Sequence, residues 1–278
     1  MKPLECQLEL LESTPWKLLI ILDACRSDTF IEAAGDGRAV LSPANCTDKW
    51  IKATTPTLEK CGITRYYTAN PLVGKHINEH IGKGTAIPLW FSLWSHLTDM
   101  EIPGVNPWAV NGWVLNDIIT DDSLVTGMGF PGYPIVVHYL QPHFPAVGTP
   151  PFAIGQWGGK WTDLHMATRR LPRPERLHKK GLLDIDYMRE SYKGNVRLAI
   201  RAAKHLVKML NVDTIITSDH GELLGEVNED GKTLFGHAMG EKSPILRSVP
   251  WLHCTPKEPR SIDESKELRE KLTVLGYY

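Results

Sequence analysis

The stretch TIITSDHGE, residues 214–222, decides how this chain folds. Its β-branched residues predict a strand, which ends on Asp219 and His220 just before a glycine turn. The same order occurs near the N-terminus, where the apolar run LLIIL leads into Asp23. Open α/β sheets bind ligands beyond the carboxyl ends of their strands. If the two strands are neighbours, Asp23, Asp219 and His220 can converge on one cation.

Short β-branched runs alternate with helical segments along the chain. The expected strands lie at residues 17–22, 65–68, 135–138 and 213–217. Apolar residues at three- and four-residue intervals predict a helix over residues 188–210, and a capping-box pattern predicts a closing helix from residue 261 to about 272. This alternation predicts α/β layering around a largely parallel sheet.

Length and composition limit the possible classes of protein. The 278 residues can bury the core of one large domain, so we expect a single domain over residues 1–278. Lys and Arg number 31 against 32 Asp and Glu, which gives no global electrostatic case for nucleic acid or an anionic membrane as partner. No apolar run is long enough to span a bilayer and no signal-peptide pattern opens the chain, so we expect a cytoplasmic protein. Five cysteines without paired spacing argue against a disulfide framework or a thiolate zinc site.

Two regions, residues 76–132 and 144–180, look irregular and are rich in Gly, Pro and Trp. Long loops inside a compact domain are commonly binding loops, so these are candidate substrate loops. The alternative is that their tryptophans pack a secondary core. The tryptophans concerned are Trp90, Trp94, Trp108, Trp113, Trp157 and Trp161.

The stretch SPANCTDKW, residues 42–50, leads into an expected helix start. A hydroxyl at a helix N-terminus lies beside free amides that also attract a phosphoryl anion, which makes Thr47 a candidate nucleophile. The opposing interpretation is that Thr47 is only the N-cap. Other candidates for the nucleophile are Ser42, Cys46, Thr54 and Thr55.

Three histidines stand where they could face a ligand. His138 ends an expected strand, His143 lies between two prolines in QPHFP, and His237 lies in the glycine-flanked GHAMG. Each one by itself could be structural, but beside the Asp219-His220 pair they indicate a metal site. Oxygen and imidazole ligands suit Zn²⁺, Mn²⁺ or Fe, and such a cation favours ester hydrolysis or group transfer over redox chemistry.

In this order the segments resemble the alkaline phosphatase and sulfatase superfamily, most closely its small archaeal sulfatase-like branch. The resemblance covers about residues 17–252 and rests on residues 22–28, 47–50, 67–71, 141–145, 218–222 and 236–237. It implies a three-layer α/β/α sandwich with a central, mostly parallel mixed sheet. It also implies a metal-dependent hydrolase of phosphodiesters or phosphomonoesters, acting through a covalent phospho-threonine intermediate.

The resemblance also implies roles for single residues. The residues that would hold one or two divalent ions, Zn or Mn, are Asp23, Thr47, His138, His143, Asp219, His220 and His237. Catalytic roles would fall to Thr47 as the attacking group, to His143 and His237 at the transferred group, and to Arg26.

Three departures from sulfatases of that superfamily bear on the reaction. Cys46 does not begin a CxPxR sequence, so conversion to formylglycine is not expected. Asp23-Ala24 stands where calcium sulfatases have paired aspartates, and His220 stands where they usually have an amide. The changes at Asp23-Ala24 and His220 favour a transition metal and phosphoester chemistry on a small-molecule or headgroup substrate. A sulfatase or a phosphoryl transferase is the alternative on the same fold, and a non-catalytic binding module is the alternative of another class.

Overall fold

The computed structural model describes residues 3–70, 72–89, 105–120, 132–152, 154 and 172–256. At its centre lies a seven-stranded sheet in the order β2-β9-β6-β1-β5-β3-β4. The strands are β1 (Leu18–Asp23), β2 (Arg38–Leu41), β3 (Arg65–Thr68), β4 (Ala86–Pro88), β5 (Ile135–Pro142), β6 (Thr214–Ser218) and β9 (Ser248–Cys254). Every pairing is parallel except the two that β9 makes with β2 and β6. The expected mostly parallel mixed sheet is therefore confirmed.

Strand β1 occupies the centre of the sheet between β5 and β6. All residues of these three strands are buried, as the continuous apolar and β-branched runs require when helices cover both faces. Leu22 pairs with Ser218 of β6, so the residues that follow on both strands leave the sheet at the same edge.

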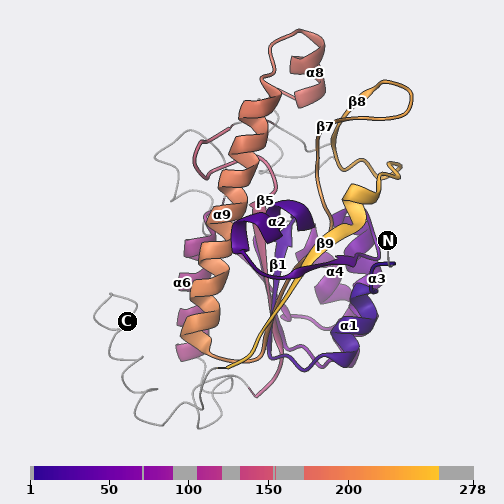
Figure 1. Cartoon of the computed structure of the whole chain (residues 1–278). Coiled ribbons are helices and arrows are strands. Elements are labelled where there is room, and N and C mark those ends of the chain that lie inside the picture. The colour runs from indigo at the N-terminus through magenta and orange to yellow at the C-terminus, as the bar shows by residue number, and fades with distance from the viewer. Residues whose placement is uncertain are drawn as a thin grey trace.

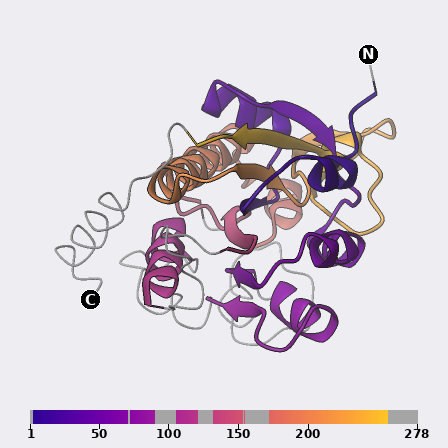
Figure 2. The ribbon, with the colours of Figure 1, turned by 90° about the horizontal axis from the view of Figure 1, so that it is seen from below.

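Helices cover both faces of the sheet, which gives the three layers of an α/β/α sandwich (Figure 2). One face carries α2 (Ser27–Ala34), α6 (Pro107–Thr120) and α9 (Ile185–Leu210). The other carries α1 (Gln7–Ser13), α3 (Thr47–Lys60) and α4 (Val73–His80). A separate hydrophobic core lies on each face of the sheet, between the sheet and the helices that cover it.

A hairpin and a short helix rise above the strand ends at the top of Figure 1. The hairpin consists of β7 (Leu223–Val227) and β8 (Thr233–Gly236), and α8 (Pro174–Lys179) lies against it, with the His178 ring 5.5 Å from that of Phe235. A 3-10 turn, η1 (Pro244–Arg247), leads from the hairpin into β9. The hairpin begins just after Asp219 and His220, and its second strand brings the chain back beside the carboxyl end of β6.

The central strands were predicted from the sequence with nearly correct starts, whereas several of the other strands were missed. All four expected strands exist with starts within one residue, although β5 continues to Pro142. The long helix begins at Ile185, three residues early, because the Asp184 carboxylate accepts the Tyr187 amide and caps it. Strands β2, β4 and β9 were missed, since they are short or contain proline. The expected closing helix from residue 261 lies outside the described residues.

The two regions that were expected to look irregular contain helices and a strand. Residues 76–132 include the end of α4, β4 and all of α6, and residues 144–180 include α8. Helix α6 was missed because it is apolar on most sides, which removes the contrast that reveals a helical period. Trp108 and Trp113 lie on α6 and are 40% and 42% exposed; the other four tryptophans lie outside the described residues. Whether these regions select substrate stays a prediction.

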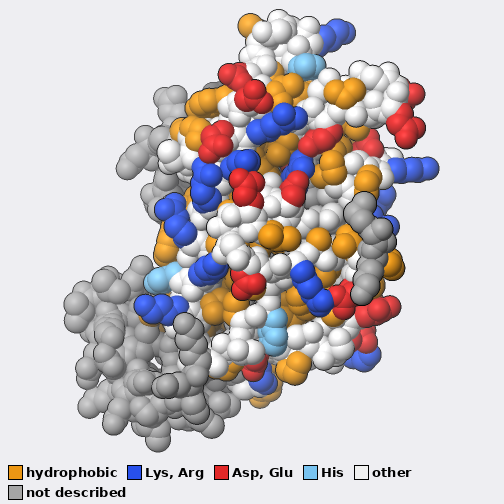
Figure 3. Space-filling view, viewed as in Figure 1, with side chains coloured by type: hydrophobic (Ala, Val, Ile, Leu, Met, Phe, Trp, Pro, Cys, Tyr) orange, Lys and Arg blue, Asp and Glu red, His pale blue; other side chains and the backbone are white. Residues whose placement is uncertain are grey.

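The outer surface of α9 carries charges of both signs. Lys193 pairs with Glu32 and Arg197 with Glu190, and Figure 3 shows blue and red side chains interspersed over this face. Among the described residues, no helix has both the length and the apolar character needed to cross a membrane.

One buried glutamine joins three elements below the strand ends. The Gln7 amide of α1 donates to Thr217 Oγ1 at 2.8 Å and to Ser218 O at 2.7 Å, and it accepts from Trp50 Nε1 of α3 at 2.9 Å. We expect Gln7→Ala to lower the free energy of unfolding by about 2–3 kcal/mol, because it leaves the buried indole N–H without its acceptor. Urea denaturation measures this loss. Glu9→Ala on the exposed side of α1 is the control and should stay within about 0.5 kcal/mol of wild type; an equal loss in both variants would contradict this role.

Candidate metal centre

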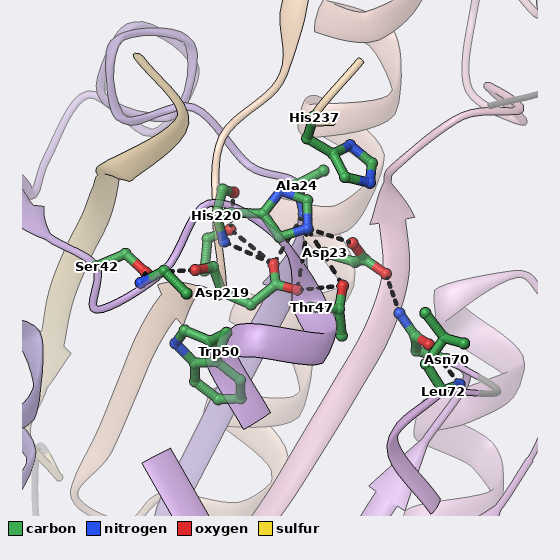
Figure 4. Close-up of polar contacts among 12 residues, drawn as sticks. Asp23, Ala24, Ser42, Thr47, Trp50, Asn70, Leu72, Asp219, His220 and His237 are labelled. Carbon is green, nitrogen blue, oxygen red and sulfur yellow. Dashed lines mark hydrogen bonds and ion pairs between the residues drawn. The ribbon is translucent and has the colours of Figure 1, made fainter. Parts of the chain in front are cut away.

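Three residues at the ends of adjacent strands converge as the sequence predicted. Asp23 ends β1, and Asp219 and His220 follow β6. All three are fully buried, and each offers a ligand atom within 4.8 Å of the other two. The His220 Nε2 atom lies 3.4 Å from Asp219 Oδ2 and 3.7 Å from Asp23 Oδ1. Figure 4 shows the three side chains pointing toward one another. We call them the first cluster.

The His220 ring is fixed in the tautomer that binds a cation. Its Nδ1–H donates to Gly221 O at 2.8 Å, which leaves the lone pair on Nε2, toward the carboxylates. Burial lowers the pKa of His220 well below its usual value, so the ring is neutral. A neutral imidazole is the form that ligates metals.

The first cluster fits a divalent cation on charge as well as on ligand type. Within the described part of the chain, no Lys or Arg pairs with either buried carboxylate, and Asp23 Oδ1 has no hydrogen-bond partner. Burial, and then the nearby Asp219, raises the pKa of Asp23 well above its usual value. Two buried carboxylates facing each other are costly unless a positive charge compensates them. Carboxylate and imidazole ligands suit Zn²⁺ or Mn²⁺.

Thr47 turns into the first cluster and does not cap its helix. Cys46 is the N-cap of α3, and Thr47 is the first helical residue. The Thr47 hydroxyl donates to Asp219 Oδ2 at 2.8 Å and lies 3.2 Å from His220 Nε2 (Figure 4). Thr47 is 4% exposed, so its hydroxyl is held in a buried position at a helix N-terminus beside the candidate cation ligands.

Of the other candidate nucleophiles, the hydroxyls have different surroundings. Ser42 donates to the backbone carbonyl of Asp219, and Thr55 donates to the carbonyl of Ile51 within α3. Thr54 lies seven residues beyond Thr47, about two helical turns away. The geometry thus favours Thr47 over these hydroxyls.

Three further residues form a second cluster next to the first. His143, Glu222 and His237 place ligand atoms within 4.8 Å of one another. His143 Nδ1 donates to Phe144 O at 2.5 Å, and His237 Nδ1 lies 3.2 Å from both Glu222 oxygens. The His237 ring centre is 4.2 Å from that of His220 and 5.1 Å from that of His143. The two clusters therefore adjoin through His237.

Glu222 was not among the predicted ligands. Burial raises the pKa of Glu222. Burial lowers the pKa of His237, but the charges of Glu222 and Asp219 and the hydrogen bond to Glu222 together raise it above its usual value. The only sign in the sequence that Glu222 could be a ligand was its position two residues after His220. It could not be assigned from sequence, because only the β7–β8 hairpin brings His237 back beside it.

His138 and Arg26 lie outside both clusters. His138 Nδ1 contacts the Tyr66 hydroxyl at 2.9 Å, and its Nε2 is 4.0 Å from Asp219 Oδ2. Burial lowers the pKa of His138 to about 4. The Arg26 guanidinium pairs instead with Asp28 at 2.6 Å and Glu226 at 2.5 Å. Arg26 Nη1 also donates to the backbone carbonyl of Glu222 at 3.4 Å, so its contact with the second cluster is to backbone and not to a ligand atom. The roles predicted for His138 and Arg26 stay predictions.

The turn after Asp23 is held in an unusual backbone conformation. Ala24 has φ 59°, a left-handed value that costs a non-glycine residue about 1 kcal/mol or more. Its amide donates to Asp219 Oδ1 at 3.0 Å, and its carbonyl accepts from the Tyr192 hydroxyl at 2.7 Å. These bonds link the end of β1 to Asp219 and to α9.

Comparisons with known proteins identify the fold. No family model matches the sequence, and no curated protein matches it. The C-terminal periplasmic domain of EcEptC from Escherichia coli, in complex with Zn, aligns with a TM-score of 0.52 at 11% identity, over 95% of this chain and 76% of that one. A second structure of that domain aligns with a TM-score of 0.51 at 11% identity, over 100% and 85%. The C-terminal periplasmic domain of phosphoethanolamine transferase EptC from Campylobacter jejuni aligns with a TM-score of 0.50 at 13% identity, over 85% and 78%.

These neighbours share the alkaline phosphatase-like sandwich, so the fold implied by the resemblance is confirmed. At such low identity the likeness concerns the fold alone. The narrower resemblance to a small archaeal branch finds no support.

The charge argument for the first cluster can be tested on stability. In the presence of a chelator, Asp23→Asn should be at least as stable as wild type, because it removes one of two uncompensated buried carboxylates. With Zn²⁺ at about 100 times its dissociation constant, wild type should gain about 2.7 kcal/mol and the variant much less. Thermal unfolding with chelator and with Zn²⁺ measures both. Wild-type melting that does not respond to Zn²⁺, Mn²⁺ or chelator would contradict the cation site.

Proposed function

We propose that the protein is a metal-dependent hydrolase of phosphoesters that acts through a covalent phospho-Thr47 intermediate. The observation that carries the proposal is the Thr47 hydroxyl, which bonds to Asp219 at 2.8 Å beside Asp23 and His220. A non-catalytic module that only binds a cation would need the carboxylates and imidazole, but it would not need a hydroxyl held beside them. Phosphodiesters and phosphomonoesters are both candidate substrates.

Asp23, Asp219 and His220 would hold one cation, with the Thr47 oxygen beside it. When bound, a divalent cation acts as a Lewis acid that lowers the pKa of a neighbouring hydroxyl and offsets charge on phosphoryl oxygens. The EcEptC domain, described in complex with Zn, supports zinc as the ion, with manganese as the alternative. His143, Glu222 and His237 would hold a second cation or contact the transferred group directly.

The chain's own groups can then divide the reaction into two steps. The Thr47 oxygen attacks phosphorus while the bond to the ester oxygen breaks. Asp219 Oδ2, which accepts the hydroxyl hydrogen at 2.8 Å, takes up the proton, and the departing ester oxygen then receives it and leaves as an alcohol. The free amides at the start of α3 would stabilise charge on the phosphoryl oxygens. Water then attacks the same phosphorus while the bond to the Thr47 oxygen breaks. One proton of the water returns to Thr47, which releases phosphate or a phosphomonoester and restores the threonine.

A second candidate is transfer of the phosphoryl-bearing group to an alcohol in place of water. It is favoured by the Campylobacter jejuni neighbour, which is a phosphoethanolamine transferase, and it uses the same first step. A sulfatase activity stays the further alternative on this fold. The cytoplasmic location expected from the sequence also stays a prediction.

The nucleophile can be tested directly. Thr47→Ala should lower kcat/KM on aryl phosphates and diesters by about a thousandfold or more, whereas Thr47→Ser keeps the attacking oxygen and should retain turnover. Mass spectrometry of acid-quenched wild type should find one added phosphoryl group on Thr47. Thr54→Val, which removes a buried hydroxyl that has no hydrogen-bond partner among the described residues, is the matched control and should keep near-normal turnover. Normal turnover in Thr47→Ala would refute the mechanism.

Hydrolysis and transfer can be separated by the acceptor. With a diester substrate, a hydrolase should release products in equal amounts at any concentration of added ethanolamine or glycerol. A transferase should form a new diester whose yield rises with the alcohol. Product analysis by ³¹P NMR distinguishes the two, and parallel assays of aryl sulfates test the sulfatase alternative; faster turnover of sulfate esters would overturn the phosphoester assignment.

A further inference from the structure

The histidines of the second cluster both lie on connecting segments, outside the sheet. His143 follows the end of β5, and His237 follows the end of β8. A ligand pair on two separate segments keeps its spacing only if other groups hold the backbone. In this protein a buried asparagine binds each of the two segments.

Asn195 on α9 binds the segment that carries His143. Its Nδ2 donates to the carbonyls of Pro142 at 3.0 Å and His143 at 3.3 Å. Its Oδ1 accepts the amides of Val147 and Gly148, both at 3.1 Å. The side chain is fully buried, so all these bonds form away from water. One amide therefore fixes both sides of the turn containing His143.

The neighbour of Asn195 explains how α9 reaches this segment. A Cβ added at Gly194 would lie 2.1 Å from the carbonyl oxygen of Thr149, and a Cβ at Gly148 would lie 2.6 Å from Gly194 O. Two glycines thus let the helix and the loop touch backbone to backbone. This close approach brings the Asn195 amide within hydrogen-bond distance of residues 142–148.

Asn45 binds the segment that carries His237. Its Nδ2 lies 2.8 Å from Glu241 O, 3.2 Å from Ala238 O and 3.4 Å from Met239 O. The residue is only 7% exposed and stands two positions before Thr47. The segment after His237 is therefore attached to the chain that presents Thr47.

We propose that Asn195 and Asn45 are positioning residues that set the separation of His143 and His237, and with it the second cation site. Both side-chain amides bond to backbone carbonyls or amides, so each residue acts through the backbone that it holds. The inference rests on the proposed function, since it gives the second cluster a cation to bind. Metal–ligand distances are expected within about 0.2 Å of their usual values, and loss of a group that supports a ligand weakens metal binding by about 10- to 100-fold.

The test compares three alanine variants of the full chain. Asn195→Ala and Asn45→Ala remove the two supports. Asn111→Ala is the matched control, because Asn111 is also buried, bonds to Ala202 O of α9 at 2.8 Å and to the Tyr139 hydroxyl, and touches neither segment. Zn²⁺ titration by calorimetry counts the sites and gives their affinities, and thermal unfolding measures stability in each variant. If an alanine variant does not fold, the isosteric Asn→Asp variant replaces it, since it loses the same donor.

We expect wild type to bind two ions with different affinities. Asn195→Ala and Asn45→Ala should each lower the affinity of the lower-affinity site by about tenfold or more and leave the affinity of the other site unchanged. Turnover of these two variants should recover at high Zn²⁺. Asn111→Ala should lose stability and keep both affinities. Unchanged binding of the second ion in both test variants, or equal weakening in the control, overturns the positioning role while the proposed function stands. Fewer than two ions in wild type overturns the two-cation site itself, and this inference with it.

Discussion

The structure depends on two carboxylates that meet, fully buried, where β1 and β6 end side by side. Asp23 and Asp219 face each other with His220 between them, and no basic side chain of the described residues compensates their charge. Burying such a pair carries an electrostatic cost, which raises the pKa of Asp23 and which a bound cation would remove. The parallel register of β1 and β6 brings the two carboxylates together. The Thr47 hydroxyl of α3 bonds to Asp219, so it lies beside the place where a cation would bind.

The elements around the pair supply what the strands alone cannot. Helix α3 brings the Thr47 hydroxyl to Asp219, and Gln7 and Trp50 tie that helix to β6 from below. The β7–β8 hairpin returns the chain so that His237 reaches Glu222 and adjoins His220. The residues of the first cluster lie at strand ends, with Thr47 beside them at a helix N-terminus. The histidines of the second cluster lie on loops. Buried asparagines bind the backbone beside the histidines of the second cluster, whereas in the first cluster Asn70 binds the side chain of Asp23 itself.

The same difference decides what could be predicted from sequence. Asp23, Asp219 and His220 could be placed together because parallel strands end at a common edge, and continuous apolar runs revealed those strands. His143 and His237 were recognised as ligand types, but their grouping with Glu222 depends on a hairpin that leaves no strong pattern. Arg26 was predicted to be catalytic without a stated contact; its guanidinium pairs with Asp28 and Glu226, and the predicted role stays untested. Helix α6 was hidden by its uniform apolarity, since a period can be read only where polar residues alternate with apolar ones.

The most direct test is a crystal structure of the Zn²⁺-loaded protein with anomalous diffraction recorded above and below the zinc absorption edge, in the presence of vanadate as a phosphoryl mimic. The account predicts one zinc peak at Asp23, Asp219 and His220, a second at His143, Glu222 and His237, and vanadate bonded to Thr47 Oγ1. A first cluster without a zinc peak at saturating Zn²⁺, or vanadate bound away from Thr47, would contradict it.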